Sequence, residues 1–109
     1  MIDADSAHQV IEQYKKHGWV LRRVLFSSPL SPLVAKLAEG TPTQKAAIDA
    51  LWFSRRSLPD CEAWELRRLS GSPFALVEVI YDSTDPEAIE SVLSGVESRM
   101  SAGSGPVSH

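Results

Sequence analysis

Adjacent arginines are the residues of this sequence best suited to binding chemistry. They form three pairs: Arg22 with Arg23, Arg55 with Arg56, and Arg67 with Arg68. A guanidinium group donates parallel hydrogen bonds to a carboxylate or a phosphate. Each pair lies in or at the end of a strand-forming run, and side chains alternate along a strand, so we expect one member on each side of the sheet. One such row would form a basic stripe for an anionic ligand or for single-stranded nucleic acid.

A structural interpretation of the same arginines is favoured over the binding interpretation. One member of each pair would reach a carboxylate such as Glu65 or Glu78, and the other would lay its stem over the edge of the sheet. Acidic residues are close at hand, and clustered charge alone is a weak signal. If a ligand is bound, the candidate binding residues are Arg22, Arg23, Arg55 and Arg67.

The three tryptophans, Trp19, Trp52 and Trp64, all fall in strand-forming runs. Aromatic residues on strands can stack on nucleic-acid bases. The alternation of glycine and aromatic residues that is typical of RNA-binding sheets is missing here. Core or subunit interface is therefore the favoured interpretation, because interfaces are enriched in aromatic residues. Trp19, Trp52 and Trp64 are the candidate interface residues.

Residue types that support catalysis do not occur in recognisable patterns. Cys61 lies between two acidic residues, which disfavour a reactive thiolate. His8 and His17 do not have the spacing of a zinc site. The sequence contains neither a Gly-x-Ser-x-Gly turn nor a glycine-rich phosphate loop. We therefore predict no catalytic residues, no metal and no cofactor, which argues against an enzyme.

Composition indicates one globular domain. The chain has 109 residues, 43% of them hydrophobic and 23% charged, with a net charge of −3. The acidic balance makes a duplex-DNA partner an unfavoured hypothesis. A single cysteine fits a reducing compartment, so a cytoplasmic location is expected. No apolar run approaches the length that crosses a bilayer, so no membrane partner is expected.

Hydrophobic periodicity and turn residues predict the elements that position these side chains. The expected order is helix 5–17, strand 19–26, short helix 31–39, helix or turn to 46, strand 48–56, strand 63–69, strand 74–82 and helix 84–100. This order predicts an α+β two-layer sandwich, with a roughly four-stranded, mainly antiparallel sheet and the N- and C-terminal helices on one face. Residues 1–100 form the domain, and the small, polar segment 101–109 is expected to be a disordered tail.

The charges of the last two strands predict the register of the hairpin that they form. A two-residue turn would place Glu65 opposite Glu78, and like charges directly opposite are unfavourable. The favoured register instead pairs Glu78 with Arg67. It places Val77 and Val79 on the same buried face as Trp64.

Three functions remain open at this point. The leading hypothesis is a non-enzymatic interaction module that self-associates through the uncovered face of the sheet or through strand edges, with another protein as a further candidate partner. The second is a protein or enzyme that binds a small anionic molecule in a pocket between sheet and helices. The third is weak binding of single-stranded nucleic acid by strand arginines.

Overall fold

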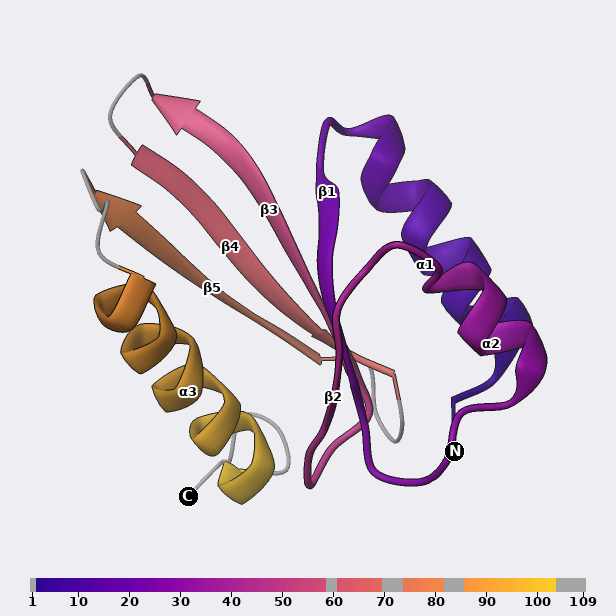
Figure 1. Cartoon of the computed structure of the whole chain (residues 1–109). Helices are drawn as coiled ribbons and strands as arrows, with labels where there is room; N and C mark the ends of the chain where they lie inside the picture. The colour runs from indigo at the N-terminus through magenta and orange to yellow at the C-terminus, as the bar shows by residue number, and fades with distance from the viewer. Residues whose placement is uncertain (1, 59–60, 70–73, 82–85, 104–109) are drawn as a thin grey trace.

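The fold is a mixed α+β fold, as the sequence predicts (Figure 1). The structure, a computed structural model, describes residues 2–58, 61–69, 74–81 and 86–103. Within these ranges the chain forms three helices and five strands. In chain order they are α1 (Ala4–Lys16), β1 (Val20–Phe26), α2 (Pro32–Leu37), β2 (Thr43–Lys45), β3 (Ala50–Leu58), β4 (Cys61–Arg68), β5 (Phe74–Tyr81) and α3 (Pro86–Gly103).

The two N-terminal helices have local start signals. In α1 the carboxylate of Asp3 accepts a hydrogen bond from the backbone N–H of Ser6 at 2.9 Å. In α2 the hydroxyl of Ser31 accepts one from Val34 N–H at 3.3 Å, followed by a proline in the first turn. These bonds satisfy backbone donors that have no partner within the helix. Gly18, with a φ of 85°, reverses the chain after α1, a conformation that favours glycine.

The described strands form one sheet in the order β2-β1-β3-β4-β5. Neighbours pair antiparallel except β1 and β2, which run parallel. The segment 43–45, predicted as helix or turn, is instead β2, and this prediction was wrong. Val24 N–H donates to Pro42 O, and Ala46 N–H donates to Phe26 O, so β2 supplies partners to the backbone of β1.

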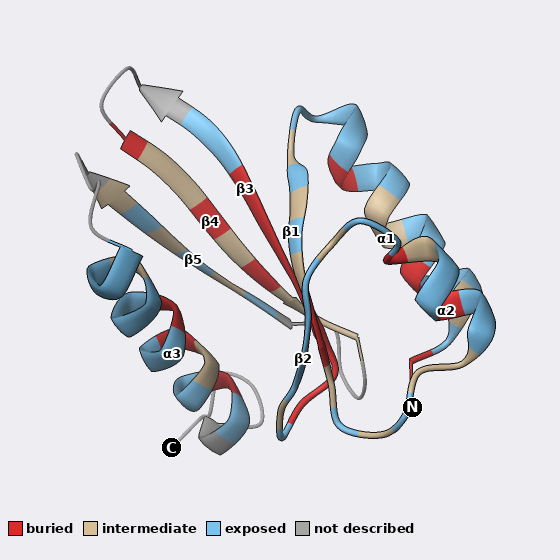
Figure 2. Ribbon diagram, viewed as in Figure 1, coloured by how far each residue is buried: buried red, intermediate tan, exposed pale blue. Residues whose placement is uncertain are grey.

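Helices cover opposite faces of the sheet, which corrects the expectation that the terminal helices share one face (Figure 2). One core lies beneath α3 and includes Trp52, Leu66 and Leu93. The other lies beneath α1 and α2 and includes Tyr14 and Phe53. The central strand β3 explains the arrangement, because its consecutive residues 50–53 are all buried, and a strand buried on both faces needs cover on both.

A β-bulge in β1 changes the direction of the first arginine pair. The pairing with β3 shifts in register between Leu21 and Arg23. Arg22 donates to the hydroxyl of Ser54, and Arg23 forms an ion pair with Glu90 of α3. Both arginines therefore lie on the α3 side of the sheet, whereas strict alternation predicted opposite sides.

The register predicted for the β4–β5 hairpin was wrong by three positions. Leu66 pairs with Leu76, and Glu65 pairs with Val77. Glu78 has its cationic partner on a helix, since Arg99 of α3 lies 3.2 Å from its carboxylate. The prediction took into account only charged partners on the neighbouring strand. It therefore assigned the side chains of β5 to the wrong faces of the sheet.

The C-terminal helix is longer than expected. α3 continues to Gly103, three residues past the predicted end of the domain. Residues 104–109 of the expected tail, and Thr84 of the expected helix cap, lie outside the described residues. No helix in the described ranges has the length and apolar character needed to cross a membrane.

Candidate functional site

One half of the sheet is left without a helix on the α1 side. Tyr14 of α1 stacks on Phe53 of β3 and its hydroxyl reaches Glu65 of β4, and α1 covers no strand beyond this point. We call the side chains of β4 and β5 that point to the α1 side of the sheet the open face. They are Ala63, Glu65 and Arg67 of β4, and Ala75, Val77 and Val79 of β5.

The part of the open face that lies nearest the edge of the sheet is apolar. Val77 is 54% exposed and Val79 is 39% exposed, and Ala75 is exposed as well. The register places Ala63 opposite Val79 and Glu65 opposite Val77. Small and branched apolar side chains therefore form a continuous row beside the charged residues of β4.

The outer border of the open face is also the edge of the sheet. β5 is the last strand in the order, and no other strand in the described ranges pairs with its outer side. Its sequence, Phe-Ala-Leu-Val-Glu-Val-Ile-Tyr, contains a single charged residue, Glu78. Edge strands of monomeric proteins are commonly short, charged or interrupted by proline, because an open edge is a template for pairing with another strand.

The inner border is formed by aromatic and charged residues that contact one another. The Tyr14 ring stacks on Phe53 with centroids 4.0 Å apart, and it meets Trp19 edge-on at 5.9 Å. The guanidinium of Arg55 lies over the Trp19 ring at 5.3 Å and donates to the carbonyl of His17 at 2.9 Å. The hydroxyl of Tyr14 donates to the Glu65 carboxylate.

A pocket of about 310 Å³ lies at this inner border. Its lining residues come from α1, the segment after α1, β3 and β4: Gln13, Tyr14, His17, Trp19, Arg55 and Glu65. The pocket thus combines an aromatic wall with one cationic and one anionic side chain.

The Tyr14 hydroxyl acts as a hydrogen-bond donor in this pocket. Burial of the phenol, followed by the hydrogen bond and charge of the Glu65 carboxylate, raises the pKa of Tyr14 to about 12, although Arg67 acts in the opposite direction. A phenol with such a pKa stays protonated at neutral pH. Tyr14 can therefore hold Glu65 in place but cannot serve as a general base.

Arg67 completes the charged inner border. It pairs with Leu51 and with Ala75 across the strands, which places it two residues from Glu65 on the same face. It lies close enough to Tyr14 to affect the pKa of that hydroxyl. Its Nε is buried and has no hydrogen-bond partner among the described residues. Such a donor is costly unless an acceptor reaches it.

The four arginines proposed as ligand residues do not form one site. Arg55 and Arg67 lie at the open face. Arg22 and Arg23 lie on the α3 side, where Arg22 is 4.8 Å from the Trp64 ring centroid and Arg23 contacts Glu90. A single basic stripe through all four is therefore not what the fold creates.

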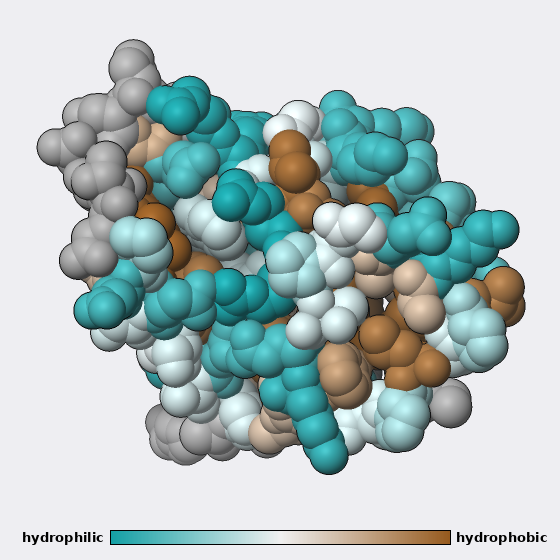
Figure 3. All heavy atoms as spheres, in the orientation of Figure 1, coloured by the Kyte–Doolittle hydropathy of each residue, from teal (hydrophilic) through white to brown (hydrophobic). Residues whose placement is uncertain are grey.

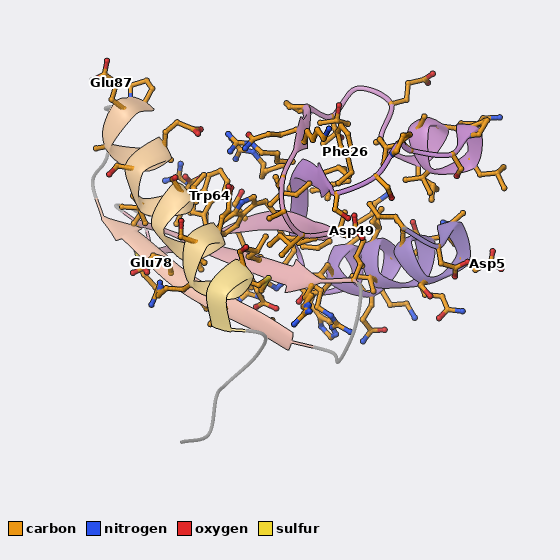
Figure 4. The ribbon with its side chains drawn as sticks, turned by 90° about the horizontal axis from the view of Figure 1, so that it is seen from below. Asp5, Phe26, Asp49, Trp64, Glu78 and Glu87 are labelled. Atoms are coloured by element: carbon orange, nitrogen blue, oxygen red, sulfur yellow. The ribbon has the colours of Figure 1, made fainter. Side chains whose placement is uncertain are left out.

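Two of the three proposed interface tryptophans lie in the core. Trp52 is fully buried and Trp64 is 6% exposed, and their rings meet edge-on beneath α3. Trp64 is labelled on the α3 side in Figure 4. These two residues offer almost no surface to a partner, so their assignment to an interface is corrected. Trp19 is half-buried at the pocket.

The residues that sequence reasoning missed are Tyr14, Glu65 and the valines of β5. Tyr14 was read only as an apolar position on the first helix. The alternation in Ala75 to Val79 was visible, but the predicted register placed the valines in the core. The uninterrupted run of buried residues at 50–53 was the signal that this strand is covered on both of its faces.

A larger hollow lies between the N-terminal helices. It has a volume of about 540 Å³ and is lined by apolar and charged residues of α1 and α2, including Ile11, Leu33 and Lys36. Hydrophobic atoms reach the surface in separate groups, one of them near α2 (Figure 3). Unlike the pocket at the inner border, this hollow has no phenylalanine, tyrosine, tryptophan or arginine among its lining residues.

Within the described ranges, no three His, Cys, Asp or Glu side chains are close enough together to hold a metal ion. No protein-family model matches the sequence, and comparison with curated proteins and with solved structures gives no match.

Proposed function

We propose that this protein is an interaction module that forms a homodimer by pairing the β5 strands of two copies. The observation that carries the proposal is the eight-residue, nearly uncharged edge of β5, which bears exposed valines on its open side. Pairing two such edges joins two five-stranded sheets into one.

Two-fold symmetry limits the register of this pairing. Residues opposite each other in an antiparallel pair lie on the same face of the sheet. The two-fold axis must therefore pass between one residue of β5 and the same residue of the second copy. A dyad at Glu78 would oppose two carboxylates, which is unfavourable. A dyad at Val77 opposes two valines and pairs each Ala75 with the other copy's Val79. The second register is therefore the one proposed.

The same register agrees with the intramolecular contacts of β5. Glu78 remains beside Arg99 of its own chain, and its strand partner becomes Leu76 of the second copy. Branched side chains in direct cross-strand pairs contribute a few tenths to about 1 kcal/mol each. A pairing of one strand edge gives a small interface, so we expect a dimer that dissociates on dilution.

The test uses light scattering after size exclusion, over a range of protein concentrations. Val77→Lys places two lysines opposite each other at the dyad, so this variant should be monomeric. Val20→Lys is the matched control, because Val20 is 58% exposed and lies on a strand distant from β5. The control should dimerise like the wild-type chain.

A charge-swap experiment tests the register itself. Val77→Glu should also be monomeric, and an equimolar mixture of Val77→Lys and Val77→Glu should restore the dimer, because opposite charges then meet at the dyad. A wild-type chain that stays monomeric at every concentration, or a Val77→Lys variant that dimerises normally, would contradict the proposal.

A further inference from the structure

We infer that the pocket at the inner border of the open face binds the carboxylate of an amphipathic acid, a molecule with one carboxylate and an apolar body such as a medium-chain fatty acid. The inference does not rest on self-association, because edge pairing through β5 leaves the open face accessible. Three features of the described residues carry it: the balance of charge, the position of the arginines and the apolar row beside them.

The charge balance at the open face favours an anion. Arg55 and Arg67 are both near Glu65: Arg67 is two residues along β4, and Arg55 is diagonal to Glu65, since Phe53 is the residue directly opposite. Among the described residues of this border there are thus two guanidinium groups for one carboxylate. The Glu65 carboxylate already accepts the hydroxyl of Tyr14, so its charge is directed toward α1.

Arg55 is held in place before any ligand arrives. Arg55 donates from Nη1 to the His17 carbonyl and rests on the Trp19 ring, which fixes the plane of its guanidinium. Arg67 is not among the lining residues of the pocket but lies beside it, near Tyr14, and has a buried Nε without an acceptor among the described residues. A carboxylate accepts such donors in pairs, at short distance and with charge assistance.

The apolar body of the ligand has a floor next to these donors. Val77 lies directly opposite Glu65, and Ala63 lies opposite Val79, so the apolar row begins where the charged border ends. From Ala75 to Val79 the strand rises about 14 Å, close to the length of a medium-chain acyl group. Covering exposed valines with such a chain removes apolar surface from water, which favours binding.

Decanoate is the probe that tests this inference, with decanol and decylammonium as probes of the same length that lack the carboxylate. Binding is measured by isothermal titration calorimetry and by tryptophan fluorescence, below the concentrations at which the probes form micelles. Trp19 lines the pocket, whereas Trp52 and Trp64 are in the core, so the fluorescence change should disappear in Trp19→Phe. We expect decanoate to bind and the two other probes to bind at least about tenfold more weakly.

Variants of the two arginines locate the site. Arg55→Gln and Arg67→Gln should each weaken decanoate binding by about tenfold or more, because each removes a charged donor. Arg56→Gln is the matched control, since Arg56 is the next residue on β3 and faces the other side of the sheet, and it should bind like the wild-type chain. Circular dichroism checks that each variant is folded.

Three results would overturn the inference: no decanoate binding up to millimolar concentration, equal binding of decylammonium, or unchanged binding in both arginine variants. The oligomeric mass of the same samples separates failure of the ligand site from failure of the proposed self-association. A monomer that binds decanoate rejects self-association alone, and a dimer that does not bind it rejects the ligand site alone.

Discussion

The hydroxyl of Tyr14 on α1 donates a hydrogen bond to the carboxylate of Glu65 on β4, joining residues 51 positions apart in the chain. The same tyrosine ring stacks on Phe53 of β3. One side chain thus connects the N-terminal helix to two strands, and it does so where the helix layer ends and the open face begins. The relationship makes Tyr14 both a core residue and the inner wall of the candidate site.

Replacing Tyr14 with phenylalanine separates these two roles. Tyr14→Phe keeps the stacked ring and removes only the hydroxyl, so the free energy of unfolding should fall by about 1 kcal/mol, the usual net value of one hydrogen bond. Tyr14→Ala also removes the buried ring and should cost about 3–5 kcal/mol. Urea denaturation followed by circular dichroism measures both. Equal losses in the two variants would show that packing of the ring contributes nothing beyond the hydroxyl.

The Tyr14 hydroxyl also makes stability depend on alkaline pH. Burial, with Glu65 as the second cause, raises the pKa of Tyr14 to about 12 in the folded chain, above the ordinary value of 10.0. A raised pKa means that the folded state holds the proton more tightly than the unfolded state. The corresponding stability is complete below pH 10 and is lost as pH rises from about 10 to about 12.

Denaturation at a series of alkaline pH values checks this dependence. The wild-type chain should lose more stability than Tyr14→Phe over this range, because the variant has no hydroxyl to titrate at that position. Phenolate absorbance should show one tyrosine that titrates late and disappears in the variant. A wild-type chain and a variant with the same alkaline profile would contradict the placement of this hydroxyl.

Asp49 gives the opposite prediction at acid pH. Asp49 is a buried residue directly before β3, and its carboxylate accepts hydrogen bonds from the N–H of Ser27 at 2.7 Å and from the Ser27 hydroxyl at 2.9 Å. Burial alone would raise the pKa of Asp49, but the two bonds from Ser27, together with the positive charge of the chain's N-terminus, more than offset it and hold the pKa below its ordinary value. The carboxylate therefore stabilises the fold when it is ionised.

The stability that Asp49 contributes should be present above about pH 4, the unfolded value, and should be lost as pH falls toward the lower folded pKa. Asp49→Ala removes a charged acceptor of two hydrogen bonds from Ser27, so it should cost about 1–3 kcal/mol at neutral pH and should flatten the acid side of the stability profile. Asp5→Ala, at an exposed position of α1, is the control and should change stability little. An unchanged acid profile in Asp49→Ala would refute this assignment.

Periodicity along the chain was enough to predict most elements, because helices and strands each bury side chains at their own spacing. Helix α1, strand β1 and helix α3 are close to their predicted bounds, and the α+β class follows from their order. The face that each helix covers was not predictable from the helices alone, since an amphipathic helix shows which side it buries but not against which side of a sheet. Only the uninterrupted apolar run at residues 50–53 indicated two cores.

The candidate site was harder to predict, because contacts distant in sequence decide it. Glu78 is neutralised by Arg99 from α3, which removed the reason for the predicted hairpin register. The bulge at Leu21 to Arg23 turned Arg22 away from the face where Arg55 and Arg67 lie. In both cases side chains of a strand lie on the opposite face of the sheet from the one predicted. A register shift by one residue is enough to cause this.

The two carboxylates that face Arg23 should differ in energetic value, although they are on the same helix. Glu97 is 16% exposed on its side chain, accepts the indole N–H of Trp52 at 2.8 Å and lies 3.8 Å from Arg23. Glu90 is 57% exposed and contacts Arg23 at 2.5 Å. Removing Glu97 leaves the indole N–H of the fully buried Trp52 without an acceptor, whereas removing Glu90 leaves Arg23 with Glu97 and strands no buried group.

Glu97→Ala should therefore lower the free energy of unfolding by about 2–3 kcal/mol, and Glu90→Ala by less than about 1 kcal/mol. Raising the salt concentration should reduce the effect of Glu90 further and leave that of Glu97 nearly unchanged, because exposed pairs are screened more strongly than buried ones. Urea denaturation at low and high salt gives both values. If the two variants were equally destabilised, Glu97 would not be the residue that fixes α3 on the sheet, and the α3 core would depend on its apolar side chains alone.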